Sequence, residues 1–212
     1  LTASGYLVQA VSSDKETRFA EVMLACVTPD EVLFGKLIGL GAAGLLQLFV
    51  WVGISTGGAA LAGSGLASAT GLVPVAAIVL APVLFVAGYF FLGSLMLVTG
   101  ALGSNAAEAQ KLSVVWSLFG VAPMLFLIAF MDAPHGAVAR ALTLFPTSAP
   151  LALMLRLGID PAGVAWWEVP LALVEIALCT WFILRVGARL FAFGLLRTSL
   201  PSLRELFRVL RG

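Results

Sequence analysis

The chain has 212 residues, of which 61% are hydrophobic and only 11% are charged, and its net charge is +1. Because a soluble domain carries about 25% charged residues, this composition excludes an ordinary soluble protein and indicates a protein with several membrane spans. The mean hydropathy of +1.08 agrees with that class. A net charge so close to zero gives no indication of a nucleic-acid partner. The two cysteines, Cys26 and Cys179, stand in different predicted elements, and their spacing fits no metal or redox motif.

The first part of the chain predicts two elements. Residues 1–11 are apolar and lack an initiating Met, so we expect them to be the end of an earlier span that begins outside this chain. Residues 13–27 predict a short amphipathic helix, because apolar residues recur there at helical spacing. Its polar face carries both signs of charge, in Asp14, Lys15, Glu16, Arg18 and Glu21. A helix of this kind lies on the membrane surface and offers charges to a soluble partner.

Four segments are long and apolar enough to span a membrane, which requires roughly 20 residues. The first is 34–54, and its helix is predicted to begin at the Thr28, Pro29 and Glu31 start signal. The other three are 72–98, 112–131 and 167–190. We expect a kink or a broken outer end at the prolines of 72–98, and 112–131 also contains a proline. The segment 142–157 is apolar but short and contains two prolines, so we expect a re-entrant or interfacial segment covered by protein.

The distribution of Lys and Arg predicts the orientation of these spans. Basic residues flank the first span, occur in the loop 99–111 and crowd the C-terminus, including the tail 195–212, so we place these three regions in the cytoplasm. The tail reads as a basic amphipathic helix that anchors on anionic lipid or contacts a cytoplasmic partner. The predicted fold is therefore an all-α integral membrane domain with several spans in the plasma membrane.

Two polar side chains lie deep in the predicted spans. Glu175 follows the Trp166–Trp167 pair by about eight residues, which places it roughly 12 Å deep at 1.5 Å per residue. An ionisable group at that depth is a candidate for the transport path, and the alternative is a carboxyl that hydrogen-bonds neighbouring helices together. Gln47 in the first span is the second candidate, although an interhelical hydrogen bond is the better interpretation there.

No catalytic, metal or nucleotide site is predicted. His135 is the single histidine and stands in a predicted outer loop, where a solvated side chain is the simpler interpretation; a zinc site would need further ligands. The segment around Lys36 lacks the glycine and the hydroxyl residue of a phosphate-binding loop. We therefore expect no cofactor, and no nucleophile is paired with a base.

The segment 11–51 resembles the signature of type-2 ABC exporter permeases, and it is most similar to the NatB-like sodium-export permease group. The positions that match the pattern are Lys15, Glu16, Arg18, Glu21, Pro29, Gly35, Lys36, Gly39 and Gln47, while Asp14 replaces a glutamate. The segments 145–157 and 193–211 also resemble the family. The resemblance implies a permease whose two copies form the transport path, and separate ABC ATPase subunits that dock on its cytoplasmic face. It also implies that an earlier span and a large extracytoplasmic region precede this chain, and it does not imply a substrate.

Two other functions remain as alternatives. A secondary transporter or channel would use Glu175 for ion coupling and would need no ATPase partner, but the charged amphipathic helix argues against it. An intramembrane enzyme would require an assembled nucleophile and base, which the sequence does not show.

Overall fold

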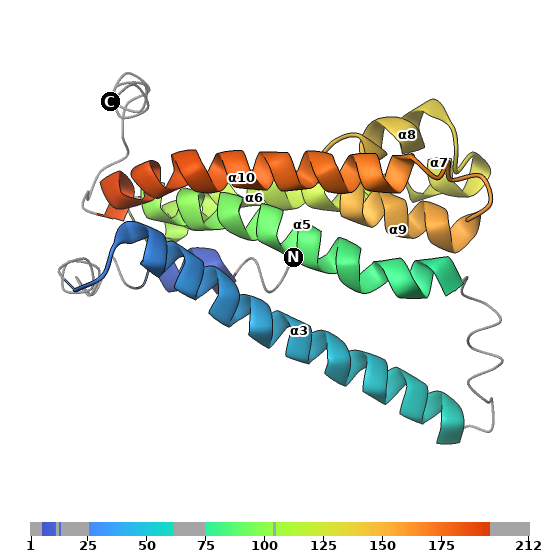
Figure 1. The fold of residues 1–212 in the computed structure, drawn as a ribbon, viewed down its shortest axis with the longest axis horizontal. Coiled ribbons are helices and arrows are strands. Elements are labelled where there is room, and N and C mark those ends of the chain that lie inside the picture. Colours follow the sequence, from blue (N-terminus) through green and yellow to red (C-terminus); the bar gives the residue numbers. More distant parts are fainter. Residues whose placement is uncertain (1–5, 12, 14–25, 62–74, 104, 196–212) are drawn as a thin grey trace.

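The computed structural model of this chain describes residues 6–11, 13, 26–61, 75–103 and 105–195. The regular secondary structure of these residues is entirely helical, which confirms the predicted all-α class for the described part of the chain. Residues 6–11 are helical, and the labelled elements are α3 Pro29–Leu61, α5 Val75–Leu102, α6 Ala106–Leu125, α7 Leu127–Asp132, α8 Ala137–Thr143, α9 Ala149–Ile159 and α10 Glu168–Leu195. Figure 1 shows the long helices running lengthwise, with α7, α8 and α9 gathered at one end.

Two of these helices are long and apolar enough to cross a membrane. The first candidate span is Phe34–Ile54, with a mean hydropathy of 2.0, and it has the bounds predicted from the sequence. The second is Val79–Leu102 in α5, with a mean hydropathy of 2.1. The predicted four-span topology beyond these two helices stays a prediction, and the predicted tail 195–212 lies almost wholly outside the described residues.

Helix α3 begins as its sequence predicts. The Thr28 backbone N–H donates to Glu31 Oε2 at 2.7 Å, and the Thr28 hydroxyl donates to the same oxygen at 2.9 Å. In return, the Glu31 backbone N–H donates to Thr28 Oγ1 at 3.4 Å, so the two side chains form a reciprocal capping box. Because the carboxylate accepts these bonds, the backbone bond first and the hydroxyl bond second, the pKa of Glu31 lies below its ordinary value.

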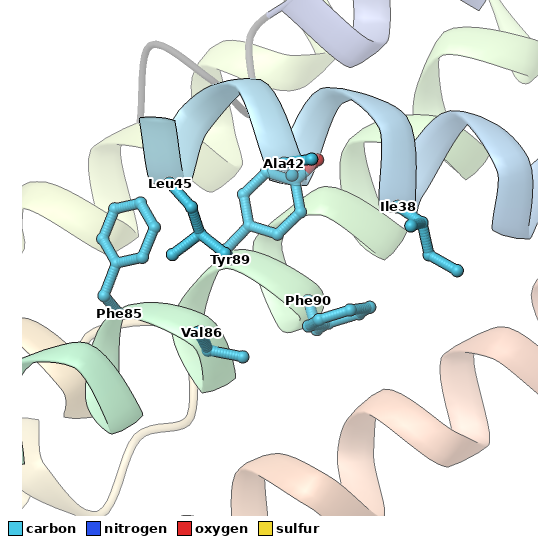
Figure 2. Close-up of a pocket in the computed structure, with 8 residues that line it drawn as sticks. Ile38, Ala42, Leu45, Phe85, Val86, Tyr89 and Phe90 are labelled. Atoms are coloured by element: carbon cyan, nitrogen blue, oxygen red, sulfur yellow. The ribbon is translucent and has the colours of Figure 1, made fainter. Parts of the chain in front are cut away.

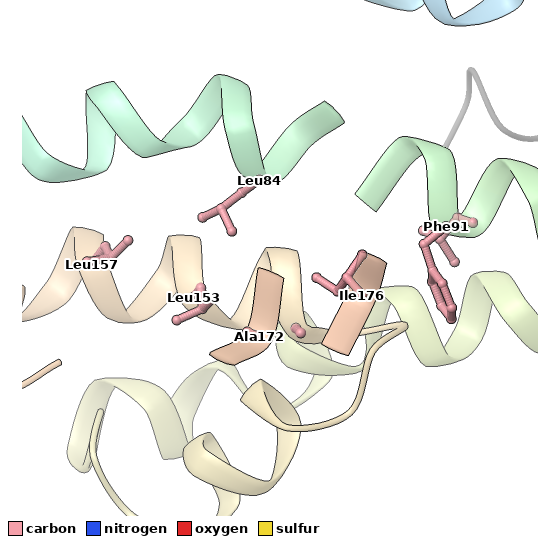
Figure 3. Packing of buried hydrophobic residues seen from close by; sticks show 8 residues of the cluster. Leu84, Phe91, Leu153, Leu157, Ala172 and Ile176 are labelled. Atoms are coloured by element: carbon pink, nitrogen blue, oxygen red, sulfur yellow. The ribbon is translucent and has the colours of Figure 1, made fainter. Parts of the chain in front are cut away.

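Helix α5 is the centre of the structure, since it contacts α3, α6, α9 and α10. Pro82 lies inside α5, and the helix continues across it. The largest buried cluster joins α5 to α9 and α10, and Figure 3 shows its side chains converging from the three helices. Its buried members are Leu84, Phe91, Leu92, Ala149, Leu153, Leu157, Ala172 and Ile176.

Glycines on α5 permit two close helix contacts. A Cβ on Gly88 would lie 2.8 Å from Pro150 Cγ, so only glycine lets the first turn of α9 approach here. A Cβ on Gly100 would lie 3.2 Å from the backbone of Val8, which holds the helix 6–11 against α5. Small residues of this kind are what membrane helices use where their backbones approach closely.

The segment 112–131 does not form one helix. Helix α6 begins at Ala106, where the Asn105 side chain caps the Glu108 backbone N–H at 2.9 Å, and it ends at Leu125. Helix α7 then begins at Leu127, after Phe126 leaves helical geometry. The proline at 123 cannot donate a backbone hydrogen bond, which weakens the helix just before this break.

The segment 142–157, predicted to be re-entrant or interfacial, is mostly helical. It contains the end of α8, a turn and most of α9. Pro146 lies in the turn, whereas Pro150 lies in the first turn of α9, where a missing N–H costs nothing. The two prolines therefore shape a helical hairpin, which we call the α8–α9 hairpin.

Candidate functional site

The predicted partner-coupling side chains lie outside the described residues. These side chains are Asp14, Lys15, Glu16, Arg18 and Glu21. The structure does describe the elements on either side of them, the helix 6–11 and the start of α3. These two elements are the described residues that precede and follow the segment 14–25 in the chain.

A lysine joins the two flanking elements. Lys36 Nζ on α3 donates to the carbonyl oxygen of Ala10 in the helix 6–11 at 3.3 Å. The apolar contact beneath this bond is continuous, with Leu7 and Val11 packing against Leu37 and Leu97. The start of α3, the helix 6–11 and α5 therefore form one packed junction.

Tyr89 makes a second contact between α3 and α5. Its hydroxyl donates to the Leu37 carbonyl oxygen at 2.9 Å, and its ring lies against Gly41, where a Cβ would be 2.7 Å from the ring. Beside this contact is an apolar cavity of about 150 Å³ between the two helices. Figure 2 shows Tyr89 and Phe90 on its α5 wall, opposite Ile38, Ala42 and Leu45 of α3.

The second half of α3 leaves the described bundle. Residues 49–54 are all exposed, and except for Gly53 each of them carries a large apolar side chain. In Figure 1 this end of α3 diverges from α5 and α10. Helices α6 and α10 also expose large apolar side chains, among them Leu118, Trp181 and Phe182. Apolar surface of this extent requires lipid or another protein to cover it.

Gln47 and Glu175, the two predicted transport-path residues, form no hydrogen bond with each other in the described part of the chain. Gln47 is exposed on α3, and Glu175 is half-buried on α10. Neither has a hydrogen-bond or ion-pair partner among the described residues, so the predicted interhelical bond of Gln47 is not formed there.

The structure contains a charged cluster that the sequence analysis missed, and Arg156 is its centre. This side chain is fully buried, with 0% exposure, on the same face of α9 as Ala149, Ala152 and Leu153. Its guanidinium forms an ion pair with Glu168, the first residue of α10, whose side chain is 6% exposed. A buried charge needs such pairing to offset the loss of hydration.

The remaining guanidinium donors tie two further segments to α9. Nε donates to the Pro134 carbonyl oxygen at 2.8 Å, and Nη1 donates to Thr143 Oγ1 at 3.2 Å. Nη2 lies 3.0 Å from His135 Nδ1, and His135 Nε2 lies 3.1 Å from Asp160 Oδ2. One arginine therefore fixes the loop after α7, the end of α8 and the start of α10 on one helix. His135 is accordingly not the simple solvated loop residue that the sequence predicted.

A signal for this cluster was present in the sequence. The residues at 149, 152, 153, 156 and 157 are spaced as one face of a helix, and Arg156 interrupts an otherwise apolar stripe. Among the described residues, no group of three or more His, Cys, Asp or Glu side chains could hold a metal ion.

Comparison with known proteins decides the class of this membrane chain. Residues 1–192 match the family described as ABC-2 family transporter protein. The chain belongs to the ABC-2 transporter family. This ABC-2 chain is thus the membrane component of a transporter and is not itself an enzyme.

Two curated relatives resemble the ABC-2 chain over most of its length. The uncharacterized protein MJ1024 of Methanocaldococcus jannaschii is 27% identical over 193 residues, which are 91% of this chain and 46% of the relative. The uncharacterized protein YhaP of Bacillus subtilis is 27% identical over 198 residues, which are 90% of this chain and 46% of the relative. The chain thus spans about half the length of the curated relatives it matches. No solved structure matches it significantly.

Proposed function

We propose that this chain is the C-terminal part of the permease subunit of an ATP-driven exporter of the NatB-like group, located in the plasma membrane. The observation that carries the proposal is the family match over residues 1–192, nine-tenths of the chain. In this proposal, separate ABC ATPase subunits hydrolyse ATP on the cytoplasmic side. The permease alternates access to a path between its spans.

The coupling step acts through the segment 14–25. The Lys36–Ala10 bond and the packed junction of the helix 6–11, α3 and α5 support this step, because they hold both ends of that segment on one rigid base. A push on Arg18 or Glu21 from a docked ATPase therefore tilts α3. The Tyr89–Leu37 bond then passes the movement to α5.

A second permease copy completes the transport path. The exposed apolar side chains of Phe49, Val50 and Ile54 support this step, because a second copy would cover apolar surface of this kind. Glu175 and Gln47 are our candidates for side chains that face the path. Both are free of partners among the described residues and available to a substrate.

The test is co-purification of full-length permease variants with an ABC ATPase subunit that co-purifies with the parent permease. Reversing Arg18 or Glu21 to the opposite charge should abolish co-purification while leaving the fold intact. Loss of one desolvated interfacial charge costs about 2–5 kcal/mol, enough to weaken docking more than about 30-fold. The matched control is Arg140→Glu, an exposed arginine on α8 on the predicted outer side. Unchanged co-purification in both reversals would remove this helix as the docking element.

A further inference from the structure

A groove runs between α5 and α10, and its lining is apolar. Its volume is about 320 Å³. Ala87 and Phe90 form the α5 side, and α10 contributes residues between 173 and 184. The hydroxyl of Thr180, within this lining, already donates to the Ile176 carbonyl oxygen of its own helix at 2.7 Å. The groove therefore accommodates a hydrocarbon chain better than a polar ligand.

An arginine lies beside this groove. The Cζ atom of Arg185 lies 5.4 Å from the centre of the Trp181 ring, and Trp181 itself lines the groove. An aromatic face attracts a cation at this distance. Arg185 is exposed, and no acidic side chain among the described residues forms an ion pair with it. Its guanidinium donors are therefore available to an anion from outside the described part of the chain.

The length of α10 gives the level of Arg185 in the membrane. Arg185 follows Trp167 by about 18 residues, which is about 27 Å at a rise of 1.5 Å per residue. Trp167 belongs to the aromatic pair predicted at one membrane surface, and the hydrocarbon core is about 30 Å thick. Arg185 is therefore expected close to the opposite surface, where phospholipid phosphates lie. From Leu184 to Leu173 the groove extends about 16 Å into the bilayer, roughly the depth of one leaflet.

We propose that this groove holds an acyl chain of an anionic phospholipid and that Arg185 binds its phosphate. The planar guanidinium can donate two parallel hydrogen bonds to phosphate oxygens, which is a stronger contact than that of a neutral donor. A positive charge at the edge of the hydrocarbon is costly without an anion, so the phosphate also offsets that cost. A headgroup with net negative charge is favoured over a zwitterionic one, whose own cation competes for the phosphate. This site requires only that α10 spans the membrane and does not depend on an ATPase partner.

The test measures lipid binding to the purified full-length permease by native mass spectrometry in mild detergent. The probes are phosphatidylglycerol and phosphatidylcholine with identical acyl chains, so that they differ only in the headgroup. The parent should retain more phosphatidylglycerol than phosphatidylcholine. Glycerol phosphate, which has the headgroup chemistry without the chains, should not displace the bound lipid. Equal retention of both lipids, or displacement by glycerol phosphate, would overturn the proposal.

Two variants address the two halves of the site. Arg185→Gln should weaken phosphatidylglycerol binding about five-fold, the effect of one basic residue at an anionic surface. The matched control is Lys111→Gln, which removes an exposed cation of α6 predicted on the same side of the membrane and should leave binding unchanged. Ala177 is exposed and lines the groove, so Ala177→Trp should fill it and lower the binding of both lipids.

Equal effects of Arg185→Gln and Lys111→Gln would contradict the phosphate contact. Lipid binding that is unchanged in Ala177→Trp would also contradict the proposal, and a permease dimer lost at the same time would assign the groove to a second copy.

Discussion

Removing the Arg156 guanidinium should destabilise the protein more than any change to an exposed charge of the same region. Arg156→Met leaves the Glu168 carboxylate buried and unpaired, and it also strips the donors from Pro134, His135 and Thr143. Breaking a buried ion pair by removing one partner costs about 3–5 kcal/mol. Since a typical domain is stable by only about 5–15 kcal/mol, this single change removes a large share of the total.

The pair can be separated from the rest of the cluster by a double-mutant cycle. Glu168→Met should cost less than Arg156→Met, because the guanidinium keeps its bonds to the Pro134 carbonyl and to Thr143. The double variant should cost clearly less than the sum of the single variants, since it leaves no unpaired buried charge. The matched control is Arg140→Met, which removes an exposed arginine from the same hairpin and should stay within about 0.5 kcal/mol of the parent.

The assay is the free energy of unfolding, measured by SDS titration in mild detergent and followed by circular dichroism. A loss above about 3 kcal/mol for Arg156→Met, with a small loss for Arg140→Met, is the expected result. Equal losses for these two arginine variants would refute the argument that Arg156 holds the hairpin to α10.

Three further predictions concern other parts of the chain. The bonds from Thr28 lower the pKa of Glu31, so the cap stabilises the folded helix fully above the ordinary glutamate pKa and loses this effect as the pH falls through the lowered pKa of the folded state. Hydrogen exchange in the first turn of α3, corrected for intrinsic rates, should show this loss in the parent and not in Glu31→Gln. Glu175→Gln should change transport or its pH dependence without lowering expression, and wild-type transport in both Glu175→Gln and Glu175→Leu would exclude it from the path. In a cysteine-free background, Gly136→Cys should react with an impermeant reagent outside intact cells and Asn105→Cys should not; the reverse pattern would invert the topology.

Local chemistry explains what the sequence could predict. The start of α3 depends on four consecutive residues, Thr28 to Glu31, so its cap could be predicted from spacing alone and is confirmed by the bonds. The span Phe34–Ile54 depends only on length and composition. The break at Phe126 was harder to predict, because Pro123 marks a weak point without fixing where the helix ends.

Long-range packing explains what the sequence could not predict. Arg156 is buried because residues 134, 143 and 168 converge on it, and no local pattern shows that convergence. The close approach of Gly88 to Pro150 likewise depends on how α5 and α9 cross. The contacts of His135 with Asp160 and Arg156 likewise join residues more than twenty positions apart along the chain.

We propose that an ATPase partner drives this permease through the segment 14–25. The most direct test reconstitutes the full-length permease in proteoliposomes with an ABC ATPase subunit that co-purifies with it and measures the rate of ATP hydrolysis. Hydrolysis should rise when the parent permease is present and should return to the rate of the isolated ATPase with Arg18→Glu. Equal rates with and without the permease, together with ion-gradient-driven transport by the permease alone, would contradict it and favour a secondary transporter.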